Sequence, residues 1–326
     1  MKRTDLHMLV TGATGFVGSF LCRRLLDKGH HVRGTLLATE SPSALPFGVE
    51  PAPVEPLGPE TRWTEALSGI DTVIHLAARV HIMDDPAADP LTEFRKVNTA
   101  GTARLAAEAA AAGVRRLVFV SSIKVNGEES SVPYTERAPL NPTDPYGISK
   151  REAEDLLRRI EAETGLEVVV LRPTLVYGPG VKANFRNLMK AVLCGVPLPL
   201  ASIANRRSLV YVGNLADAVA ACAVHPQAGG KTYLISDGDD ISTPELVRRL
   251  AAALGVPPRL FPVPVFLMRM VGAVAGRRAA IDRLAGSLTV DSSKIHRELN
   301  WTPPFSMEEG LRATAEWFLA TGRKTS

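Results

Sequence analysis

Cysteine is scarce in this chain of 326 residues. The three cysteines, Cys22, Cys194 and Cys222, lie far apart and form no Cys-x-x-Cys pair, which argues against a disulfide framework and against a zinc site. The seven histidines are equally scattered, so we expect no bound metal. The first residues show no apolar segment followed by a cleavage site. Together with the cysteine usage, this predicts a cytoplasmic protein.

Long apolar runs are missing as well. The most apolar stretch, residues 263–275, is interrupted by Pro264 and Arg269, whereas a membrane-spanning helix needs roughly 18 uninterrupted apolar residues. We interpret this stretch as a buried helix and expect no membrane insertion. Charge of one sign is not in large excess either, because 38 lysines and arginines face 34 aspartates and glutamates. The net charge of +4 does not indicate a protein that binds nucleic acid.

What the sequence does contain is a regular alternation of strand and helix signals. Hydrophobic residues make up 45% of the chain and charged residues 22%, which is typical of globular proteins. The predicted strands lie at 7–11, 32–37, 71–76, 116–121 and 167–171, and the predicted helices at 16–28, 92–112 and 145–164. Nearly continuous apolar strands that alternate with helices indicate a parallel sheet covered on both faces. We therefore predict an α/β fold with a doubly wound parallel sheet.

A glycine-rich turn follows the first predicted strand. In Thr11-Gly12-Ala13-Thr14-Gly15-Phe16-Val17-Gly18 the glycines recur every third residue, and a helix is predicted to begin within the turn. Gly12 permits the tight turn, Gly15 lets the backbone approach a pyrophosphate, and Gly18 lets the helix pack closely on the strand. Strand, turn and helix in this order predict a dinucleotide-binding domain of the Rossmann type. The alternative is a turn whose glycines serve geometry alone.

The chain changes character after residue 173. Helices become shorter, prolines more frequent, and only isolated strands are predicted, at 209–212 and 232–235. We assign residues 1–173 to the dinucleotide-binding domain and residues 174–326 mainly to a smaller substrate-binding region. The chain is expected to cross back to the first domain near 207–235.

A tyrosine and a lysine form the second chemical motif. Tyr146 and Lys150 are four residues apart at the start of a predicted helix, so they share one face. An ammonium beside a phenol lowers the pKa of the tyrosine from about 10, which makes it usable as an acid and base near neutral pH. Ser122, just after the strand at 116–121, is placed to bond the same substrate oxygen. We predict a hydride-transfer site; the alternative is an exposed helix pair and a strand-end cap.

These motifs together resemble the short-chain dehydrogenase/reductase superfamily, in its extended branch that contains the NAD-dependent epimerase/dehydratase family. Further stretches that resemble the family are His75-Leu76-Ala77-Ala78, Asn98-Thr99-Ala100-Gly101-Thr102, Arg172-Pro173 and Leu299-Asn300-Trp301-Thr302-Pro303. The resemblance implies that Ser122, Tyr146 and Lys150 are catalytic. The residues implied for the cofactor are Gly12, Thr14, Gly15, Phe16, Val17, Leu76, Ala77, Ala78, Asn98, Ser121, Tyr146, Lys150 and Pro173. Asn98 is expected to support the strand of Ser122 and the loops near the cofactor.

The choice between NAD and NADP stays open at this point. The family usually carries an acidic residue at the end of the second strand, where this chain has Thr35, Leu36 and Leu37. Pro56 also stands where an adenine-binding aspartate is common. Without a carboxylate to repel a 2′-phosphate, the sequence leans slightly to NADP, and Arg33 would help to bind the cofactor if it faces the site.

The resemblance also implies contacts to a nucleotide-sugar substrate. Arg207 matches an arginine that holds the diphosphate, a task that suits its planar donor fork. Asn184 matches a second diphosphate contact, with an exposed loop position as the alternative. Lys124 is a candidate cation of the substrate pocket, with a solvated lysine as the alternative. The full implied set is Arg79, Lys124, Asn126, Tyr146, Leu175, Asn184 and Arg207.

Two substrate-side positions depart from the usual pattern of the epimerases. Asn126 stands where a tyrosine is usual, and Leu175 where an asparagine is common. The stretches Arg79-Val80-His81-Ile82-Met83 and 121–128 most resemble a subgroup that acts on UDP-linked N-acetyl-amino sugars. That subgroup includes 4-keto-reductases that form UDP-N-acetylquinovosamine for polysaccharide biosynthesis.

We therefore expect an NAD(P)-dependent oxidoreductase acting at C4 of a UDP-hexose or UDP-N-acetylhexosamine, with reduction of a 4-keto-6-deoxy sugar nucleotide ranked first. The alternative is a UDP-glucose or UDP-N-acetylglucosamine 4-epimerase that retains NAD. A 4,6-dehydratase is disfavoured because Ser122-Ile123-Lys124 replaces the Thr-Asp-Glu of those enzymes. A non-catalytic NAD(P)-binding module ranks last, because such proteins typically lose the tyrosine or the lysine. As is usual in the family, we expect a homodimer, with the helices at 92–112 and 145–164 as candidate contact surfaces.

Overall fold

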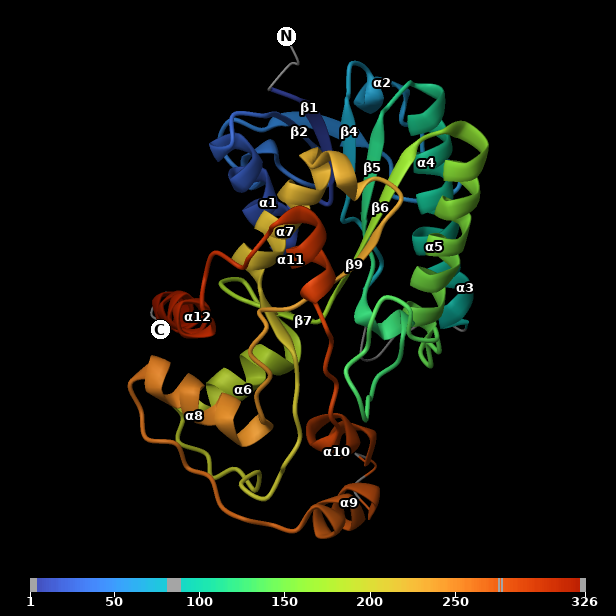
Figure 1. Cartoon of the computed structure of the whole chain (residues 1–326). Helices are drawn as coiled ribbons and strands as arrows, with labels where there is room; N and C mark the ends of the chain where they lie inside the picture. Colours follow the sequence, from blue (N-terminus) through green and yellow to red (C-terminus); the bar gives the residue numbers. More distant parts are fainter. Residues whose placement is uncertain (1–4, 81–88, 275, 277, 323–326) are drawn as a thin grey trace.

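Seven parallel strands form the central sheet of the molecule (Figure 1). The structure is a computed structural model that describes residues 5–80, 89–274, 276 and 278–322. In chain order the strands of this sheet are β1 His7–Thr11, β2 His31–Leu37, β3 Glu50–Val54, β4 Thr72–His75, β5 Arg116–Val120, β6 Glu167–Pro173 and β9 Thr232–Ile235. They lie in the order β3-β2-β1-β4-β5-β6-β9, so the winding direction reverses between β1 and β4. The predicted doubly wound α/β fold is confirmed.

Helices cover both faces of the sheet and build a second lobe. Their bounds are α1 Phe16–Asp27, α2 Thr64–Leu67, α3 Pro90–Phe94, α4 Thr102–Ala111, α5 Pro145–Thr164, α6 Ala183–Leu193, α7 Val212–Val224, α8 Thr243–Leu254, α9 Val265–Val274, α10 Arg278–Ala285, α11 Ser293–Leu299 and α12 Met307–Gly322. The sequence predicts α5 with these bounds and places the end of α1 one residue further on.

Alternate residues of the strands pack against opposite helical layers, because successive strand side chains point to opposite faces. Met8 and Val10 of β1 are buried in a cluster that includes residues of α1 and α7. Leu9 is buried in the cluster on the other face, together with residues of α4 and α5. Figure 1 accordingly shows α1 and α7 on one side of the sheet and α4 and α5 on the other.

The third strand closes one edge of the sheet. It lies within a proline-rich stretch of the sequence, and β3 itself contains Pro51 and Pro53. Proline lacks a backbone N–H and is therefore confined in sheets to edge strands and similar positions. β3 pairs with β2 alone among the described strands, from Arg33 opposite Glu50 to the strand ends.

The helix predicted for 92–112 is not a single α-helix. α3 runs into a π-helical segment, Arg95–Gly101, which continues directly into α4. The wider turn of this segment accommodates Asn98, which is buried there. π-Helical turns are often found at functional sites. Helix propensity does not distinguish a π-turn from an α-turn, so the sequence did not indicate it.

The second lobe follows β6. Strands β7 (Leu175–Tyr177) and β8 (Leu209–Tyr211) pair in parallel, and α6, α8 and α12 pack with them around their own hydrophobic core. Tyr177, Met189 and Leu311 are among its buried residues. The chain then returns to the first sheet, since β9 lies beside β6.

Helices α9 and α10 form a peripheral hairpin, at the bottom of the view in Figure 1. The sequence predicts a buried helix at 263–275, and this prediction is wrong for most of α9. Phe266, Met270 and Val271 are between 62% and 69% exposed, whereas Met268 is buried in the core of the second lobe and Val265 packs partly against it. Residue 275 lies outside the described residues. Within the described ranges, no helix is both long and apolar enough to cross a membrane.

Candidate active site

The glycine-rich turn lies at the carboxyl edge of the sheet, between β1 and α1. Gly12 has a φ of +70°, and a Cβ there would meet the backbone nitrogen of Ala77 at 3.0 Å. A Cβ on Gly18 would clash with the carbonyl oxygen of Gly12, so α1 packs this closely only because none is present. Gly15 caps α1 without a side-chain hydrogen bond, and the first turn of α1 holds no acidic residue. This uncapped, positively polarised helix start fits the diphosphate of a dinucleotide.

A buried chain of hydrogen bonds fixes the strand ends below this turn. Thr11 Oγ1 lies 2.7 Å from His75 Nδ1, and His75 Nε2 lies 2.9 Å from Thr102 Oγ1. Thr11 Oγ1 also accepts hydrogen bonds from the N–H groups of Leu76 and Ala77, at 3.2 and 3.1 Å. Burial lowers the pKa of His75 to about 3, so its ring stays neutral. Leu76 and Ala77 are thereby held against the glycine turn.

A carboxylate that the sequence did not reveal lies beside the same turn. Glu40 comes three residues after β2, but the chain folds back so that its Oε1 accepts a hydrogen bond from Thr14 Oγ1 at 2.6 Å. Its Oε2 accepts one from the Leu37 N–H at 2.8 Å. The inference from the sequence that this place lacks an acidic residue is therefore wrong, because the fold brings Glu40 to it. A negative charge here disfavours a 2′-phosphate and favours NAD over NADP.

Arg33 does not face the glycine turn. Its Nη1 donates hydrogen bonds to the carbonyl oxygens of Ala66 and Ser68, at 3.1 and 2.8 Å. Its Nη2 forms an ion pair with Glu50 at 3.0 Å. Glu50 begins β3 and Ser68 precedes β4, so these partners lie toward the amino ends of the strands. The expectation that Arg33 binds the cofactor is wrong.

Ser122, Tyr146 and Lys150 come together where β5 ends. Tyr146, in the first turn of α5, shares a hydrogen bond with the Ser122 side chain. One turn further along α5, Lys150 is 2% exposed, and its Nζ donates a hydrogen bond to the carbonyl oxygen of Val120 at 2.9 Å. The predicted grouping of these three side chains is therefore present in the fold.

The electrostatics of this group differ from the expected pattern. Burial and the nearby Asp144 carboxylate raise the pKa of Tyr146, while the hydrogen bond with Ser122 acts in the opposite direction. Burial also lowers the pKa of Lys150 to about 7. The Lys150 Nζ lies 6.0 Å from the centroid of the Tyr146 ring and is directed to the Val120 carbonyl. The tyrosine pKa is therefore not lowered overall in this arrangement, because burial outweighs the predicted effect of Lys150.

Phe94 packs on Tyr146, and Arg79 packs on Phe94. The ring of Phe94 meets the Tyr146 ring edge-on, with 6.2 Å between the centroids. The Arg79 guanidinium lies over the Phe94 ring, 5.4 Å from its centroid. Arg79, implied as a substrate contact, is thus linked to Tyr146 through the ring of Phe94. Residues 81–83 of the stretch that resembles the amino-sugar subgroup lie outside the described residues.

Asn98 joins the loop after β4 to α5. Its Oδ1 accepts a hydrogen bond from the Arg79 N–H at 2.8 Å, and its Nδ2 donates to the Arg79 carbonyl oxygen and to Ser149 Oγ, both at 3.0 Å. It therefore holds the loop next to the cofactor turn, as expected. Its second partner is the helix of Tyr146, however, and not the strand of Ser122.

A buried ion pair contacts Ser121, the residue before Ser122. Glu154 and Arg172 are 1% and 2% exposed, and two Arg172 nitrogens donate to the carboxylate at 3.0 and 2.5 Å. Ser121 Oγ donates to the same carboxylate at 2.5 Å, and Arg172 Nη1 donates to Asn126 Oδ1 at 3.2 Å. The side chains of Ser121 and Asn126 are therefore engaged in hydrogen bonds with the Glu154–Arg172 ion pair. Their predicted contacts with the cofactor and the substrate are wrong for these side chains.

Lys124 is also engaged. Its Nζ pairs with Asp144 and, at 3.0 Å, with Glu128. Asp144 in turn caps α5 by accepting a hydrogen bond from the Gly147 N–H at 2.6 Å. Lys124 thus ties the turn after β5 to the start of α5. Because two carboxylates neutralise it, the expectation of a substrate-pocket cation is wrong.

The residues implied for the sugar nucleotide lie on the second lobe. Arg207 Nη1 donates to the carbonyl oxygens of Arg283 and Gly286, at 2.7 and 3.0 Å, and burial lowers the pKa of its guanidinium. Asn184 is exposed in the first turn of α6. Leu175, at the start of β7, is 51% exposed. No contact between these three positions is observed among the described residues, so their roles stay predictions.

The remaining positions implied for the cofactor flank the turn. Phe16 and Val17 begin α1 and pack partly against the core of the second lobe. A Cβ on Gly180 would meet the Phe16 ring at 3.3 Å, so the chain that enters this lobe passes close to the start of α1. Pro173 ends β6 and is buried, and Ala78 follows β4.

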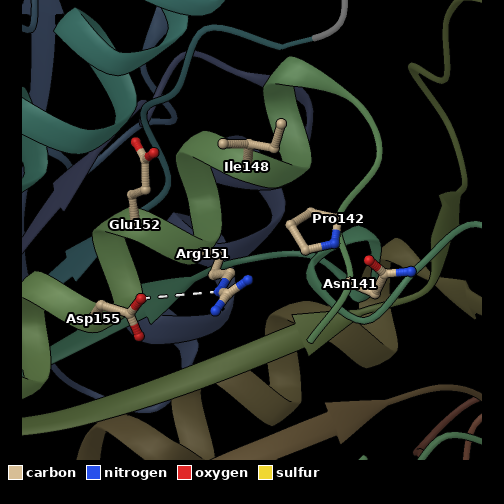
Figure 2. Close-up of a pocket in the computed structure, with 6 residues that line it drawn as sticks. All are labelled: Asn141, Pro142, Ile148, Arg151, Glu152 and Asp155. Carbon is tan, nitrogen blue, oxygen red and sulfur yellow. Dashed lines mark ion pairs between the residues drawn. The ribbon is translucent and has the colours of Figure 1, made fainter. Parts of the chain in front are cut away.

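A separate hollow of about 320 Å³ lies along α5 (Figure 2). It is lined by Asn141, Pro142, Ile148, Arg151, Glu152 and Asp155. Arg151 faces Asp155 across 4.0 Å, whereas Glu152 pairs with Arg95 at 2.7 Å. None of the predicted site residues lines this hollow, so it is not part of the candidate active site.

Among the side chains that the structure describes, no group of three or more histidine, cysteine, aspartate or glutamate side chains is placed to hold a metal ion. Cys22 and Cys222 are buried and unpaired with each other, and Cys194 is exposed.

Comparisons with known proteins agree with this geometry. The model of the NAD-dependent epimerase/dehydratase family matches residues 8–236. A UDP-glucose 4-epimerase of Vibrio cholerae is 43% identical over 99% of this chain and 98% of its own. The N-acetyl-alpha-D-glucosaminyl-diphospho-ditrans,octacis-undecaprenol 4-epimerase of Escherichia coli O157:H7 is 26% identical over 98% of this chain and 97% of its own. The solved structure of MoeE5 in complex with UDP-glucuronic acid and NAD has a TM-score of 0.78 at 27% identity, covering 97% of this chain and 99% of that one. On this evidence the chain belongs to the NAD-dependent epimerase/dehydratase family.

Proposed function

We propose that the protein is an NAD-dependent 4-epimerase of a UDP-hexose or UDP-N-acetylhexosamine. The observation that carries the proposal is the grouping of Ser122, Tyr146 and Lys150 at the end of β5, at the same sheet edge as the glycine turn. The 43% identity to an epimerase over nearly the whole chain supports it. The sequence alone ranks net reduction of a 4-keto sugar first. The relative and the carboxylate of Glu40 favour epimerisation with NAD instead.

Epimerisation at C4 requires a proton to leave the 4-hydroxyl and later return to the same oxygen. The glycine turn and the amides at the start of α1 would hold NAD, which would supply the acceptance and return of hydride. The Tyr146 hydroxyl removes and restores the proton, and Ser122 donates a hydrogen bond to the oxygen. These two hydroxyls already share a hydrogen bond, so both reach one substrate atom. The second lobe, with Arg207, binds the diphosphate so that the sugar can turn over between the two transfers.

Lys150 stabilises the charged form of Tyr146 in this scheme. Its pKa of about 7 is below the ordinary value for lysine, so near neutral pH the side chain exists as a mixture of ammonium and amine. The ammonium form favours the phenolate of Tyr146, which burial alone disfavours. The carbonyl of Val120 keeps the Nζ at the strand end.

The direct test uses the purified protein with UDP-glucose or UDP-N-acetylglucosamine and no added reductant. We expect conversion to the galacto epimer until an equilibrium mixture is reached. Chromatography of the sugar nucleotides monitors this conversion. Denaturing the protein should release NAD, which mass spectrometry identifies. An epimerase can retain NAD because it restores its cofactor in each turnover. Failure to form either epimer with NAD supplied would contradict the proposal, as would stoichiometric oxidation of NADPH by a 4-keto-6-deoxy UDP-sugar.

Replacing Glu40 should change the cofactor preference. Glu40→Gln keeps an acceptor for Thr14 but removes the negative charge beside the turn. We expect the ratio of NADP to NAD affinity to rise by about tenfold, which corresponds to the loss of roughly 1.4 kcal/mol of charge repulsion. Titration calorimetry with both cofactors measures this ratio. Glu55→Gln, at an exposed position, is the matched control and should leave it unchanged; an unchanged ratio in Glu40→Gln would remove Glu40 from cofactor selection.

A second candidate substrate is a sugar linked through diphosphate to a polyprenol. The relative from Escherichia coli O157:H7 is named for such a substrate. The specific observation in its favour is that Arg207, the implied diphosphate contact, is hydrogen-bonded to the end of α10, in the hairpin with the exposed apolar face. Parallel assays with UDP-N-acetylglucosamine and with N-acetylglucosaminyl-diphospho-undecaprenol in detergent distinguish the two, because the preferred substrate will show the higher kcat/KM.

A further inference from the structure

The hairpin of α9 and α10 presents an apolar surface that nothing in the described chain covers. We call its exposed side the hairpin face; it consists of Phe266, Leu267, Met270 and Val271 of α9 and Leu284 of α10, and these residues are between 41% and 69% exposed. The four α9 residues are spaced as one helical stripe. Met268, on the other side of α9, is buried in the core of the second lobe and holds the helix in place. Contiguous exposed apolar surface of this kind marks an interaction site more often than a chance feature.

The sequence segment that contains the hairpin carries mostly basic charged residues. Residues 250–290 contain five arginines and a single aspartate, Asp282, and no lysine or glutamate. Their net charge of +4 equals the net charge of the entire chain, so the rest of the protein is neutral overall. Asp282 is paired with Arg269 at 2.8 Å, which also joins the two helices. Guanidinium groups pair well with phosphate oxygens.

From these two features we propose that the hairpin face docks on the surface of an anionic lipid bilayer. An apolar helical stripe flanked by basic residues is the pattern of helices that lie in the plane of a membrane interface. The apolar side chains enter the boundary between headgroups and acyl chains, and exposed arginines such as Arg283 meet the lipid phosphates. α9 is too short to span a bilayer, so the docking is peripheral. The expected absence of membrane insertion then holds for spanning but not for this shallow contact.

The docking would place the substrate side of the protein near the membrane. Arg207 Nη1 is hydrogen-bonded to the carbonyl oxygens of Arg283 and Gly286, which end the hairpin. The hairpin is therefore attached to the lobe that the proposed function assigns to the diphosphate. The docking itself is independent of which sugar the site accepts, and a binding assay tests it without any activity.

The experiment is sedimentation of the full chain with vesicles of two compositions. Vesicles of phosphatidylcholine with phosphatidylglycerol should bind the protein at least about tenfold more tightly than vesicles of phosphatidylcholine alone, and 0.5 M salt should weaken the binding. The double variant Phe266→Ser, Met270→Ser should lose at least about tenfold in affinity. The control Phe47→Ser, Val132→Ser removes two apolar residues elsewhere that are more exposed than Phe266 and Met270, and it should bind as the original chain does.

The remaining outcomes overturn the proposal. No sedimentation with anionic vesicles, equal affinity for both compositions, or equal losses in the two double variants would each exclude docking through this face. Light scattering after size exclusion measures the mass of the protein and tests whether a second copy of the chain binds the hairpin face instead. If the mass corresponds to a dimer that becomes a monomer only in Phe266→Ser, Met270→Ser, the face contacts a second copy and not a bilayer. Circular dichroism confirms that both variants are folded.

Discussion

Tyr146→Phe should lower the kcat for C4 epimerisation by about 10²- to 10⁴-fold, the range found for loss of a general acid–base group. The hydroxyl of Tyr146 is the group that shares a hydrogen bond with Ser122 at the end of β5, and phenylalanine removes it without removing the ring that packs on Phe94. The KM for the sugar nucleotide should change little, because the proposed diphosphate contacts lie on the other lobe. Steady-state kinetics of epimer formation at saturating substrate measure the effect.

A second tyrosine provides the matched control. Tyr233 in β9 is fully buried at its side chain, and its hydroxyl donates a hydrogen bond to Glu298 at 3.0 Å, on α11. Tyr233→Phe therefore loses one hydroxyl and one hydrogen bond outside the site, and its kcat should stay within about twofold. If Tyr146→Phe retained kcat to the same extent as Tyr233→Phe, the assignment of Tyr146 as the proton carrier would be wrong.

Glu154→Gln should lower the free energy of unfolding by about 3–5 kcal/mol, which is the usual cost of breaking a buried ion pair on one side. Glu154 and Arg172 are almost completely buried, and the carboxylate also accepts the Ser121 hydroxyl. The amide leaves the guanidinium of Arg172 without a compensating charge. Urea denaturation followed by circular dichroism measures the change.

The control for charge removal is a glutamate on the same helix. Glu163 is exposed near the end of α5, and Glu163→Gln should change the unfolding free energy by less than about 0.5 kcal/mol. The double variant Glu154→Leu, Arg172→Met replaces the pair by apolar side chains and should recover much of the lost stability. Equal stability of Glu154→Gln and Glu163→Gln would show that the buried pair contributes nothing. Because Ser121 precedes Ser122, the loss of the pair should also reduce activity.

The fold and the grouping of the candidate catalytic residues could be predicted from the sequence because local signals determine them. Periodic apolar runs specify the strands and helices, and each motif lies where a strand ends. Parallel strands place all these ends at one edge of the sheet, so Gly12, Ser122 and Tyr146 are brought to the same edge without any knowledge of side-chain contacts. The one irregular stretch, the π-helical segment, has no such local signal.

The errors concern residues whose role depends on a distant partner. Glu40 reaches Thr14 only because the chain turns back after β2, and Lys124 is neutralised by Asp144, twenty positions later. Asn126 is drawn to Arg172, which itself is buried against Glu154. Each of these contacts joins segments that are separate in the sequence, so residue type and spacing did not reveal them.

The exposed α9 illustrates the same point for hydrophobicity. An apolar helix is buried only if another element of the fold covers it, and composition alone does not say whether such an element exists. Here Met268, and in part Val265, pack against the second lobe, while the hairpin face stays uncovered.

The prolines of β3 have a consequence for how copies of this protein can associate. The outer edge of a sheet offers unpaired backbone groups on which a strand from another molecule can add. In an extended strand the N–H groups of alternate residues face the same side, so Pro51 and Pro53 remove two successive donors from a single side of the strand. We expect that side to be the outer one, because prolines in edge strands are placed toward solvent. A neighbouring chain then finds acceptors without donors at this edge, which prevents continuous sheet growth there. We therefore expect no assembly of this protein by strand addition at the rim of β3.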